Sequence, residues 1–322
     1  MSTVSVGIDV CTEFLDIHLR PANRFFRLKN DPDGHAEFIR QLRSLGTPSP
    51  DLRLCMEATG GLETPLAVAL AEAGFPVAVI NPRQIRDFAK ASGRRAKTDK
   101  LDAAVLAHFA EAMQPRAHAP LPENLRQFRD ILDRRAQLLQ MRTMENNRLA
   151  STTHKPVKRD LLLHLAWLDK RIKAVEKELD ELVAANFEWK LTDELLQSIP
   201  GFGVQTARVL IGQLPELGKF DRRSLANLVG LAPMNDDSGD RVGGRRIVGG
   251  RSHVRRALYM AALSAIRYYD NFKTVYANLV ARGKAKKVAI IAVARKLLCI
   301  ANAVLRDQTP WRDSDSPKPE TA

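Results

Sequence analysis

Hydrophobic and polar residues alternate at a period of two along the start of the chain. Apolar residues at 4, 6, 8 and 10 alternate with Ser5, Gly7 and Asp9, and those at 15, 17 and 19 alternate with Asp16, His18 and Arg20. This pattern is typical of strands with one buried face and predicts a meander. Predicted helices and strands then alternate, which indicates a mixed sheet with helices packed on it. The strands are expected at 4–10, 15–19, 24–29, 52–57 and 75–80, and the helices at 34–45 and 62–73.

From about residue 123 the apolar positions change to helical spacing. They recur at 125, 128, 132, 136 and 139, and after Pro156 at 161, 165, 168, 172, 175, 179 and 182. The second series alternates intervals of four and three residues, which indicates a coiled-coil arm or a helical hairpin. The facing helix can belong to the same chain or to another subunit.

These changes in the spacing of apolar residues divide the chain into four segments. We expect a sheet domain at 1–118, a coiled-coil arm at 119–190, a mainly helical domain at 191–306 and a disordered tail at 307–322, where prolines and mixed charges do not support a core. The fold class is therefore an α/β domain followed by α-helical regions.

Composition excludes several classes of protein. With 322 residues, of which 45% are hydrophobic and 27% charged, the chain is not of the disordered class. The cysteines at 11, 55 and 299 form no CxxC pair, which argues against a disulfide scaffold or zinc site and favours the reducing cytoplasm. No signal peptide is visible, and Arg295 and Lys296 interrupt the apolar stretch 288–304, so no membrane span is expected.

Positive charge is concentrated in one segment. Residues 241–306 contain fifteen Lys and Arg against the single acid Asp270, a net charge of +14 in a chain that carries +13 overall. A merely solvated basic face is the simpler explanation, but this asymmetry favours a surface that binds a polyanion such as nucleic acid.

Four acids stand at positions where strands end or a helix begins. Asp9 and Glu57 lie at the ends of predicted strands, and Asp99 and Asp102 share one face at the start of a predicted helix. Each alone can be explained as a cap, a loop contact or a partner of a helix dipole. Together they offer the oxygen ligands that Mg²⁺ prefers, and two such ions would stabilise the attacking and leaving oxygens of a phosphodiester.

Two segments of the helical domain suit nucleic acid. Pro200, Gly201 and Gly203 form the turn of a predicted helix-hairpin-helix, in which the second helix would offer backbone amides to a phosphate, although an ordinary helical corner has the same signature. A glycine-rich loop then carries arginines that can fork onto phosphates. The predicted nucleic-acid-binding arginines are Arg241, Arg245, Arg246, Arg251, Arg255 and Arg256.

The segments VGIDV (6–10), CMEATG (55–60), VINP (79–82) and KTDKLDA (97–103) together resemble the insertion-sequence-110 family of transposases, which includes the Piv/MooV-type DNA invertases. The resemblance extends over nearly the whole chain except the tail. It implies an RNase H-like (RuvC-like) DEDD domain that binds Mg²⁺ through Asp9, Glu57, Asp99 and Asp102, followed by a C-terminal serine transposase domain.

The family's serine nucleophile matches Ser238. The resemblance implies that the protein cuts and rejoins donor and target DNA through a phosphoserine intermediate. It also implies a guide RNA encoded by the element, a homo-oligomer from dimer to tetramer, and a place at the bacterial nucleoid. The loop after Ser238 is shorter than the family pattern, so Ser252 and Tyr259 stay as rival nucleophiles.

Two other functions stay open on the sequence. A metal-dependent junction nuclease would use the four acids to activate water and leave no protein–DNA adduct. A non-catalytic assembly factor would bind nucleic acid in a salt-sensitive manner without cleaving it. The complete set of four acids argues against the second alternative.

Overall fold

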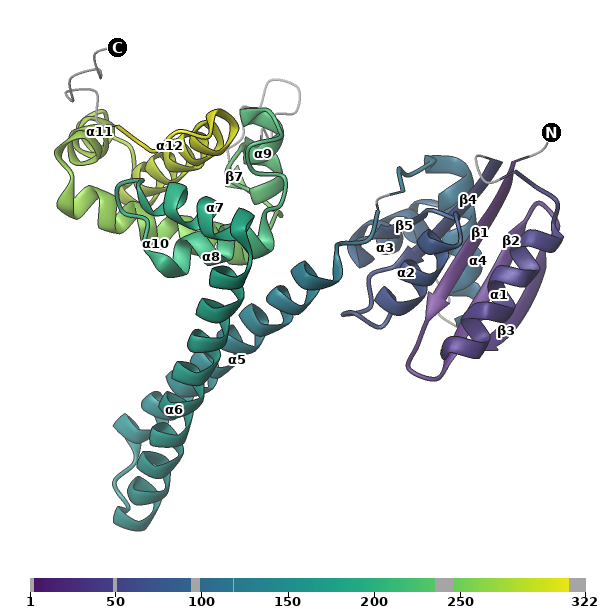
Figure 1. The fold of residues 1–322 in the computed structure, drawn as a ribbon, viewed down its shortest axis with the longest axis horizontal. Helices are drawn as coiled ribbons and strands as arrows, with labels where there is room; N and C mark the ends of the chain where they lie inside the picture. The colour runs from purple at the N-terminus through teal and green to yellow at the C-terminus, as the bar shows by residue number, and fades with distance from the viewer. Residues whose placement is uncertain (1–2, 49–50, 94–98, 118, 235–245, 313–322) are drawn as a thin grey trace. The chain divides into compact units, whose positions relative to one another are not determined.

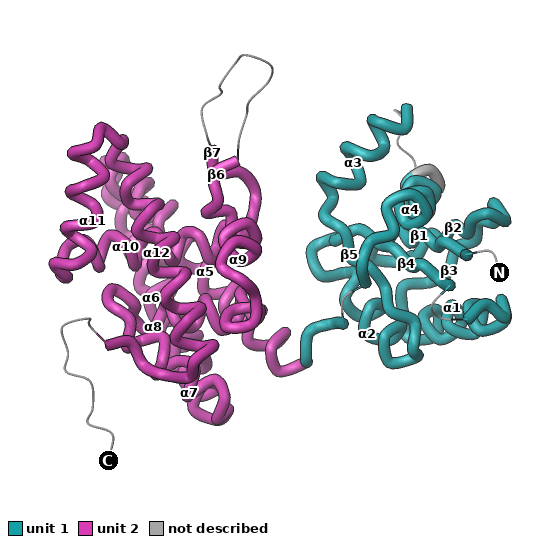
Figure 2. Tube along the Cα trace, turned by 90° about the horizontal axis from the view of Figure 1, so that it is seen from above, with its two compact units in different colours: residues 1–122 teal, residues 123–322 magenta. Residues whose placement is uncertain are grey.

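The computed structural model describes residues 3–48, 51–93, 99–117, 119–234 and 246–312, with the backbone alone at 99–101 (Figure 1). The chain divides into two compact units, unit 1 at Met1–Pro122 and unit 2 at Glu123–Ala322 (Figure 2). The helical arm and the C-terminal helical domain that the sequence separates thus belong to a single unit.

Unit 1 is built on a five-stranded sheet in the order β3-β2-β1-β4-β5. An antiparallel meander is paired on its β1 side with two parallel strands, which confirms the predicted mixed sheet. This arrangement is compatible with an RNase H-like domain. The strands are β1 (Val4–Val10), β2 (Phe14–Arg20), β3 (Arg24–Lys29), β4 (Leu52–Glu57) and β5 (Val77–Ile80).

Helices α1 (Pro32–Ser44) and α2 (Thr64–Glu72) pack on one face of this sheet. Asp31 caps α1 by accepting a hydrogen bond from the backbone N–H of Gly34, and a proline opens each helix, as is common at N-termini. Ile8, Ile17 and Phe38 are fully buried in the core between these layers. The alternating apolar residues of the meander therefore face this side.

Helices α3 (Pro82–Ala91) and α4 (Asp99–Met113) belong to a second core, on the opposite face. Cys55 of β4 lies in this core, and burial raises the pKa of its thiol to about 12. Because both faces are covered, the polar residues that alternate along β1 and β2 are covered by α4 instead of facing water.

Unit 2 is helical and begins with two long helices, α5 (Glu123–Ser151) and α6 (Lys155–Ala185), that pack on each other as a hairpin. The predicted seam of α6 is confirmed from Leu161 to Leu179, but its last member is Val183 and not Leu182. In α5, Leu138 is buried in place of the predicted Ala136 and Leu139. The facing helix is thus the neighbour in the same chain.

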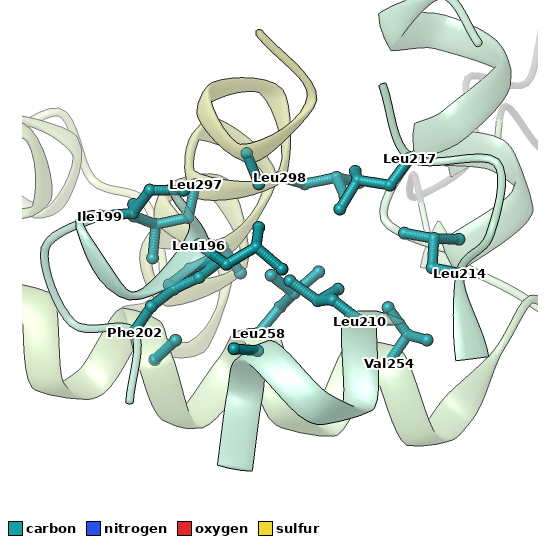
Figure 3. Packing of buried hydrophobic residues seen from close by; sticks show 14 of the residues in the cluster. Leu196, Ile199, Phe202, Leu210, Leu214, Leu217, Val254, Leu258, Leu297 and Leu298 are labelled. Carbon is teal, nitrogen blue, oxygen red and sulfur yellow. The ribbon is translucent and has the colours of Figure 1, made fainter. Parts of the chain in front are cut away.

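The rest of unit 2 packs against the base of this hairpin around one core. Figure 3 shows part of that core from close by. Leu196, Leu210, Leu258 and Leu297 come from four different helices and are almost fully buried. The last helix is long and apolar enough to cross a membrane, yet its apolar residues line this core. The remaining elements are α7 (Phe187–Gln197), α8 (Val204–Gln213), α9 (Arg222–Val229), β6 (Pro233–Met234), β7 (Arg246–Ile247), α10 (Ser252–Tyr268), α11 (Asp270–Ala281) and α12 (Lys286–Asp307).

Candidate active site and nucleic-acid interface

Asp9 and Glu57 lie at the carboxyl ends of two neighbouring parallel strands. The register pairs Ile8 of β1 with Met56 of β4, so the next residue on each strand is one of the two acids. Asp9 shares a face with Gly7, and Glu57 shares one with Cys55, because side chains alternate along a strand. This is the face covered by α4, and both acids are half-buried there.

The path of α4 brings Asp102 to the same end of the sheet. A Cβ on Gly7 would lie 2.1 Å from the carbonyl oxygen of Ala103, so only glycine lets the helix backbone cross β1 this closely. At the other end of the sheet, Arg20 pairs with Glu111 of α4 at 2.8 Å. Helix α4 therefore runs antiparallel to β1, and its first turn, with the half-buried Asp102, lies toward Asp9.

The chemistry of this set fits a hard divalent cation. Asp9, Glu57 and Asp102 supply carboxylate oxygens, and Asp99 opens α4 with a side chain that lies outside the described residues. Among the side chains that the structure describes, no three acids, histidines or cysteines gather closely enough to hold a metal ion. The fold thus directs the acids to one edge, and the metal-binding tetrad stays a prediction.

A buried ion pair beside Asp9 was not found by sequence reasoning. Asp16 of β2 is the register partner of Asp9, and its two carboxylate oxygens accept hydrogen bonds from Arg27 of β3 at 2.7 and 2.6 Å. Asp16 is only 3% exposed, although the alternation groups it with polar residues. Asp16 is buried because α4 covers the polar positions of β2, so that both faces of the sheet are covered. The alternation of apolar and polar residues does not reveal this second cover.

The predicted hairpin between α7 and α8 contains two glycines with different surroundings. Gly201 has a φ of +82°, and a Cβ there would lie 2.5 Å from the carbonyl oxygen of Ala261 in α10, so this glycine lets the turn pack against α10. Gly203 precedes α8 in extended backbone, with no side-chain cap and open space around it. Of the two, Gly203 is the one that leaves room for a phosphate.

Two of the predicted phosphate-binding arginines make contacts inside the protein. Arg251 forms a bidentate pair with Glu216 at 2.5 and 2.6 Å, and Arg255 donates to the carbonyl oxygens of Val229 and Gly249. Burial raises the pKa of Glu216, but the hydrogen bond from Arg251, a backbone hydrogen bond and the charges of Arg251 and Arg129 together outweigh it, so the pKa is lowered. Nucleic-acid binding by Arg251 and Arg255 stays a prediction. The Arg255 side chain already holds the end of α9, and that of Arg251 holds the segment between α8 and α9.

One of the two loop glycines that the structure describes, Gly250, serves the same packing, whereas a Cβ on Gly249 would meet open space. A Cβ on Gly250 would lie 2.3 Å from the backbone nitrogen of Gly230, the left-handed residue that ends α9. The sequence suggested that the loop glycines let the backbone approach a ligand closely. At Gly250 the backbone instead approaches another part of the same chain. Gly243 and Gly244 lie outside the described residues.

Ser238, Arg241 and Arg245 also lie outside the described residues, between β6 and β7, which pair with each other. Arg246 is exposed on β7, and Arg256 is exposed on α10. The rival nucleophiles are both on α10: Ser252 is its exposed first residue, and Tyr259 is half-buried.

Comparison with known proteins covers both units. Residues 6–154 match the DEDD transposase domain of the IS110 family, and residues 193–277 match the transposase family IS116/IS110/IS902. The chain belongs to the IS110 family of transposases. It is an enzyme that acts on DNA, and the DEDD domain indicates use of a divalent metal ion.

Several relatives extend this family match. The chain is 29% identical over 321 residues to the pilin gene-inverting protein of Moraxella lacunata, covering 97% of this chain and 98% of that protein, and the Moraxella bovis protein of the same name is equally similar. An uncharacterized 43.6 kDa protein of insertion element IS110 from Streptomyces coelicolor is 31% identical over 139 residues, which are 42% of this chain and 33% of that protein.

Proposed function

We propose that this transposase cuts and rejoins DNA through a covalent phosphoserine intermediate at Ser238, with Mg²⁺ held by Asp9, Glu57, Asp99 and Asp102. The observation that supports the metal site most is the convergence of the carboxyl ends of β1 and β4 with the first turn of α4. When bound there, Mg²⁺ would supply positive charge to the phosphoryl oxygens of the DNA backbone.

The hydroxyl of Ser238 performs the bond exchange in this proposal. Its Oγ gives up its proton and forms a bond to phosphorus as the bond between phosphorus and the oxygen of one DNA strand end breaks, and the departing oxygen takes up that proton. Rejoining reverses this exchange with a different strand end. Arg241, Arg245 and Arg246 flank the serine in the sequence and would carry positive charge to the phosphate. The reaction therefore requires residues from both units.

The partners that we propose are donor DNA, target DNA and a guide RNA encoded by the element, in a homo-oligomer from dimer to tetramer. The DNA part is supported by the Moraxella relatives, whose name describes inversion of a pilin gene and whose similarity covers 97% of this chain. The segment 241–306, with its excess of basic residues, supplies charge for both nucleic acids.

A covalent-adduct assay tests this proposal. Full-length protein would be mixed with Mg²⁺, labelled element-junction and target DNA, and RNA transcribed from both flanks, and then run on a denaturing gel. We expect a retarded band with the wild type that is absent in Ser238→Ala and in Asp9→Ala. Ser252→Ala tests the rival serine, and Asp33→Ala, at an exposed acid of α1, is the matched control for Asp9→Ala.

A metal-dependent junction nuclease is the second candidate, favoured by one observation. The acids all belong to unit 1, which has its own cores, so hydrolysis needs no residue of unit 2. Cleaved DNA without an adduct, unaffected by Ser238→Ala and abolished by Asp9→Ala, would establish this reading and exclude the phosphoserine. Loss of the adduct in Ser252→Ala alone would move the nucleophile to α10.

A further inference from the structure

A groove of about 1020 Å³ lies in unit 2 between α5, α8 and α10, and its lining contains none of the residues assigned to catalysis. Apolar side chains such as Leu139 of α5 and Val209 of α8 line it, together with amide side chains from the same two helices. A flat apolar group with hydrogen-bonding edges suits such a lining, because the amides can both donate and accept while the apolar surface takes the faces.

The amides of the groove include Gln140 of α5 and Gln205 of α8. Gln205 donates to Glu176 at 3.3 Å through its Nε2, but its Oε1 is hidden from solvent and accepts no hydrogen bond within the described part of the chain. A buried acceptor without a partner costs free energy, so a ligand whose donor meets this oxygen once the Gln205 amide turns into the groove gains affinity. The exocyclic amino group of a nucleobase is such a donor.

The groove begins where the hairpin turn ends. Gln205 and Thr206 line it from the first turn of α8, directly after Gly203, which leaves open space and has no side-chain cap. A phosphate held at this helix N-terminus would thus be the neighbour of the groove. The lining acid, Asp133, accepts a hydrogen bond from Gln213 at the opposite end of α8, and the acid that contacts Gln205 near Gly203, Glu176, is paired with Arg135 at 2.6 Å.

Exposed residues of α10 complete this wall. Arg256 and Met260 line the groove, and Met260 is 58% exposed, so its side chain is available to an occupant. A methionine beside a basic residue offers one surface for the face of a base and one charge for its phosphate. Arg256 and Met260 are one turn apart, so both project from the same side of α10.

We infer that this groove binds an unpaired nucleotide, with its phosphate at the N-terminus of α8 and its base between Gln140, Gln205 and Met260. A paired base cannot enter, because its hydrogen-bonding edge is engaged inside the duplex. The inference rests on the proposed nucleic-acid function but needs neither Mg²⁺ nor Ser238. Single-stranded RNA and single-stranded DNA share the chemistry, and the experiment separates them.

The test measures binding without cleavage. Full-length protein in EDTA would be titrated with fluorescein-labelled single-stranded RNA, single-stranded DNA and a blunt duplex of one mixed sequence. The variant is Gln140→Ala/Gln205→Ala. The matched control is Gln127→Ala/Gln197→Ala, which removes one amide from α5 and one from α7 outside the groove. We expect about tenfold weaker binding of one or both single strands for the groove variant, less than twofold for the control, and no specific loss on the duplex.

A base analogue gives a second readout, and its measurement on wild-type protein needs no variant. An oligonucleotide with one 2-aminopurine should change its fluorescence on binding wild-type protein, and Met260→Ala should reduce that change. The single strand, RNA or DNA, for which the groove variant loses more affinity is the one that the groove binds. Equal losses for the groove variant and the control, or equal losses on single strand and duplex, would overturn the inference. Loss of strand transfer with intact groove binding would contradict the proposed function alone.

Discussion

Each unit of the molecule holds a bidentate arginine–carboxylate pair beside residues assigned to function, and the two pairs differ in how deeply the acid is buried. In unit 1 the acid is buried: the side chain of Asp16 is 4% exposed, while that of Arg27 is 46% exposed. In unit 2 both partners are partly covered, with Glu216 at 23% and Arg251 at 31%. Arg251 also donates to the carbonyl oxygen of Gln213, so it joins two loops.

This difference changes how charge should be interpreted in the two units. Asp16 adds a buried negative charge directly beside Asp9, with a guanidinium that offsets it. Arg251 and Arg255, in contrast, are counted among the basic residues of the segment 241–306 but are engaged within the protein. The net charge of +14 in that segment therefore overstates what is free for nucleic acid, and exposed residues such as Arg256 matter more.

The largest effect is expected from Gly7→Val, which tests whether the packing of α4 organises the acidic edge. The new side chain would collide with the backbone of α4 at Ala103 and Ala107, and we expect a loss of about 3 kcal/mol or more in unit 1. All three tryptophans lie in unit 2, so far-UV circular dichroism should show an earlier urea transition while tryptophan fluorescence does not.

The control for this variant is Ile8→Val, the next residue on β1, which faces the opposite core and should cost about 1 kcal/mol. A Gly7→Val protein with an unchanged urea transition would show that α4 can move off β1 freely. The geometric argument for Asp102 would then fail.

The next effect is expected from Asp16→Asn. The substitution removes the charge that Arg27 pairs with, and a cost of about 2 kcal/mol is expected because the guanidinium is half in solvent. Glu111→Gln, which breaks the more exposed pair with Arg20 on the same strand, should change the free energy of unfolding by less than about 0.5 kcal/mol. Urea unfolding followed by circular dichroism compares the two, and equal losses would contradict a special role for the buried pair.

Much of unit 1 could be predicted from the sequence because its strands alternate and end at recognisable turns. The strand-end positions of Asp9 and Glu57 followed from the same pattern, since parallel strands share an edge. Asp16 could not be placed, because period-two alternation gives two faces and does not say whether the polar one is covered. Gly7 is informative only when the helix that crosses it is known.

Unit 2 was less predictable because its contacts join distant parts of the chain. The heptad pattern found α6, but the buried residue of α5 shifted to Leu138 since the facing surface is set by the pairing of the two helices. The partner of Arg251, Glu216, is 35 residues away, and no local pattern links them. Ser238 depends on the family resemblance alone, as an isolated serine beside a glycine is typical of an ordinary turn.

A smaller and pH-dependent effect is expected from Glu216→Gln. The folded-state pKa of Glu216 is lowered, so its contribution to stability is present above its unfolded value of about 4.3 and is lost as the pH falls through the folded value. We expect the variant to lose about 1 kcal/mol at pH 7 and less at acidic pH. Asp133 and Asp193 have raised pKa values, so they also make the stability of the wild type depend on pH. The quantity to measure is therefore the difference in the free energy of unfolding between wild type and variant, by tryptophan fluorescence in urea from pH 7 to pH 3. A difference that grows on acidification would contradict the assigned pair.

The smallest effect on stability, and the sharpest contrast with Arg251, is expected from Arg256→Gln. Arg256 is exposed on α10, so its loss should change the free energy of unfolding by less than about 0.5 kcal/mol. If it contacts a phosphate, affinity for nucleic acid should fall several-fold at low salt, and the slope of log affinity against log salt should decrease by about one. Arg251→Gln should instead lower stability first, with no change in that slope once measured well below its unfolding midpoint. Binding isotherms between 50 and 200 mM salt for both variants separate an arginine that binds the ligand from one that builds the fold. The reverse pattern would mean that the internal pair opens to bind nucleic acid, and the charge of the whole segment would then be available after all.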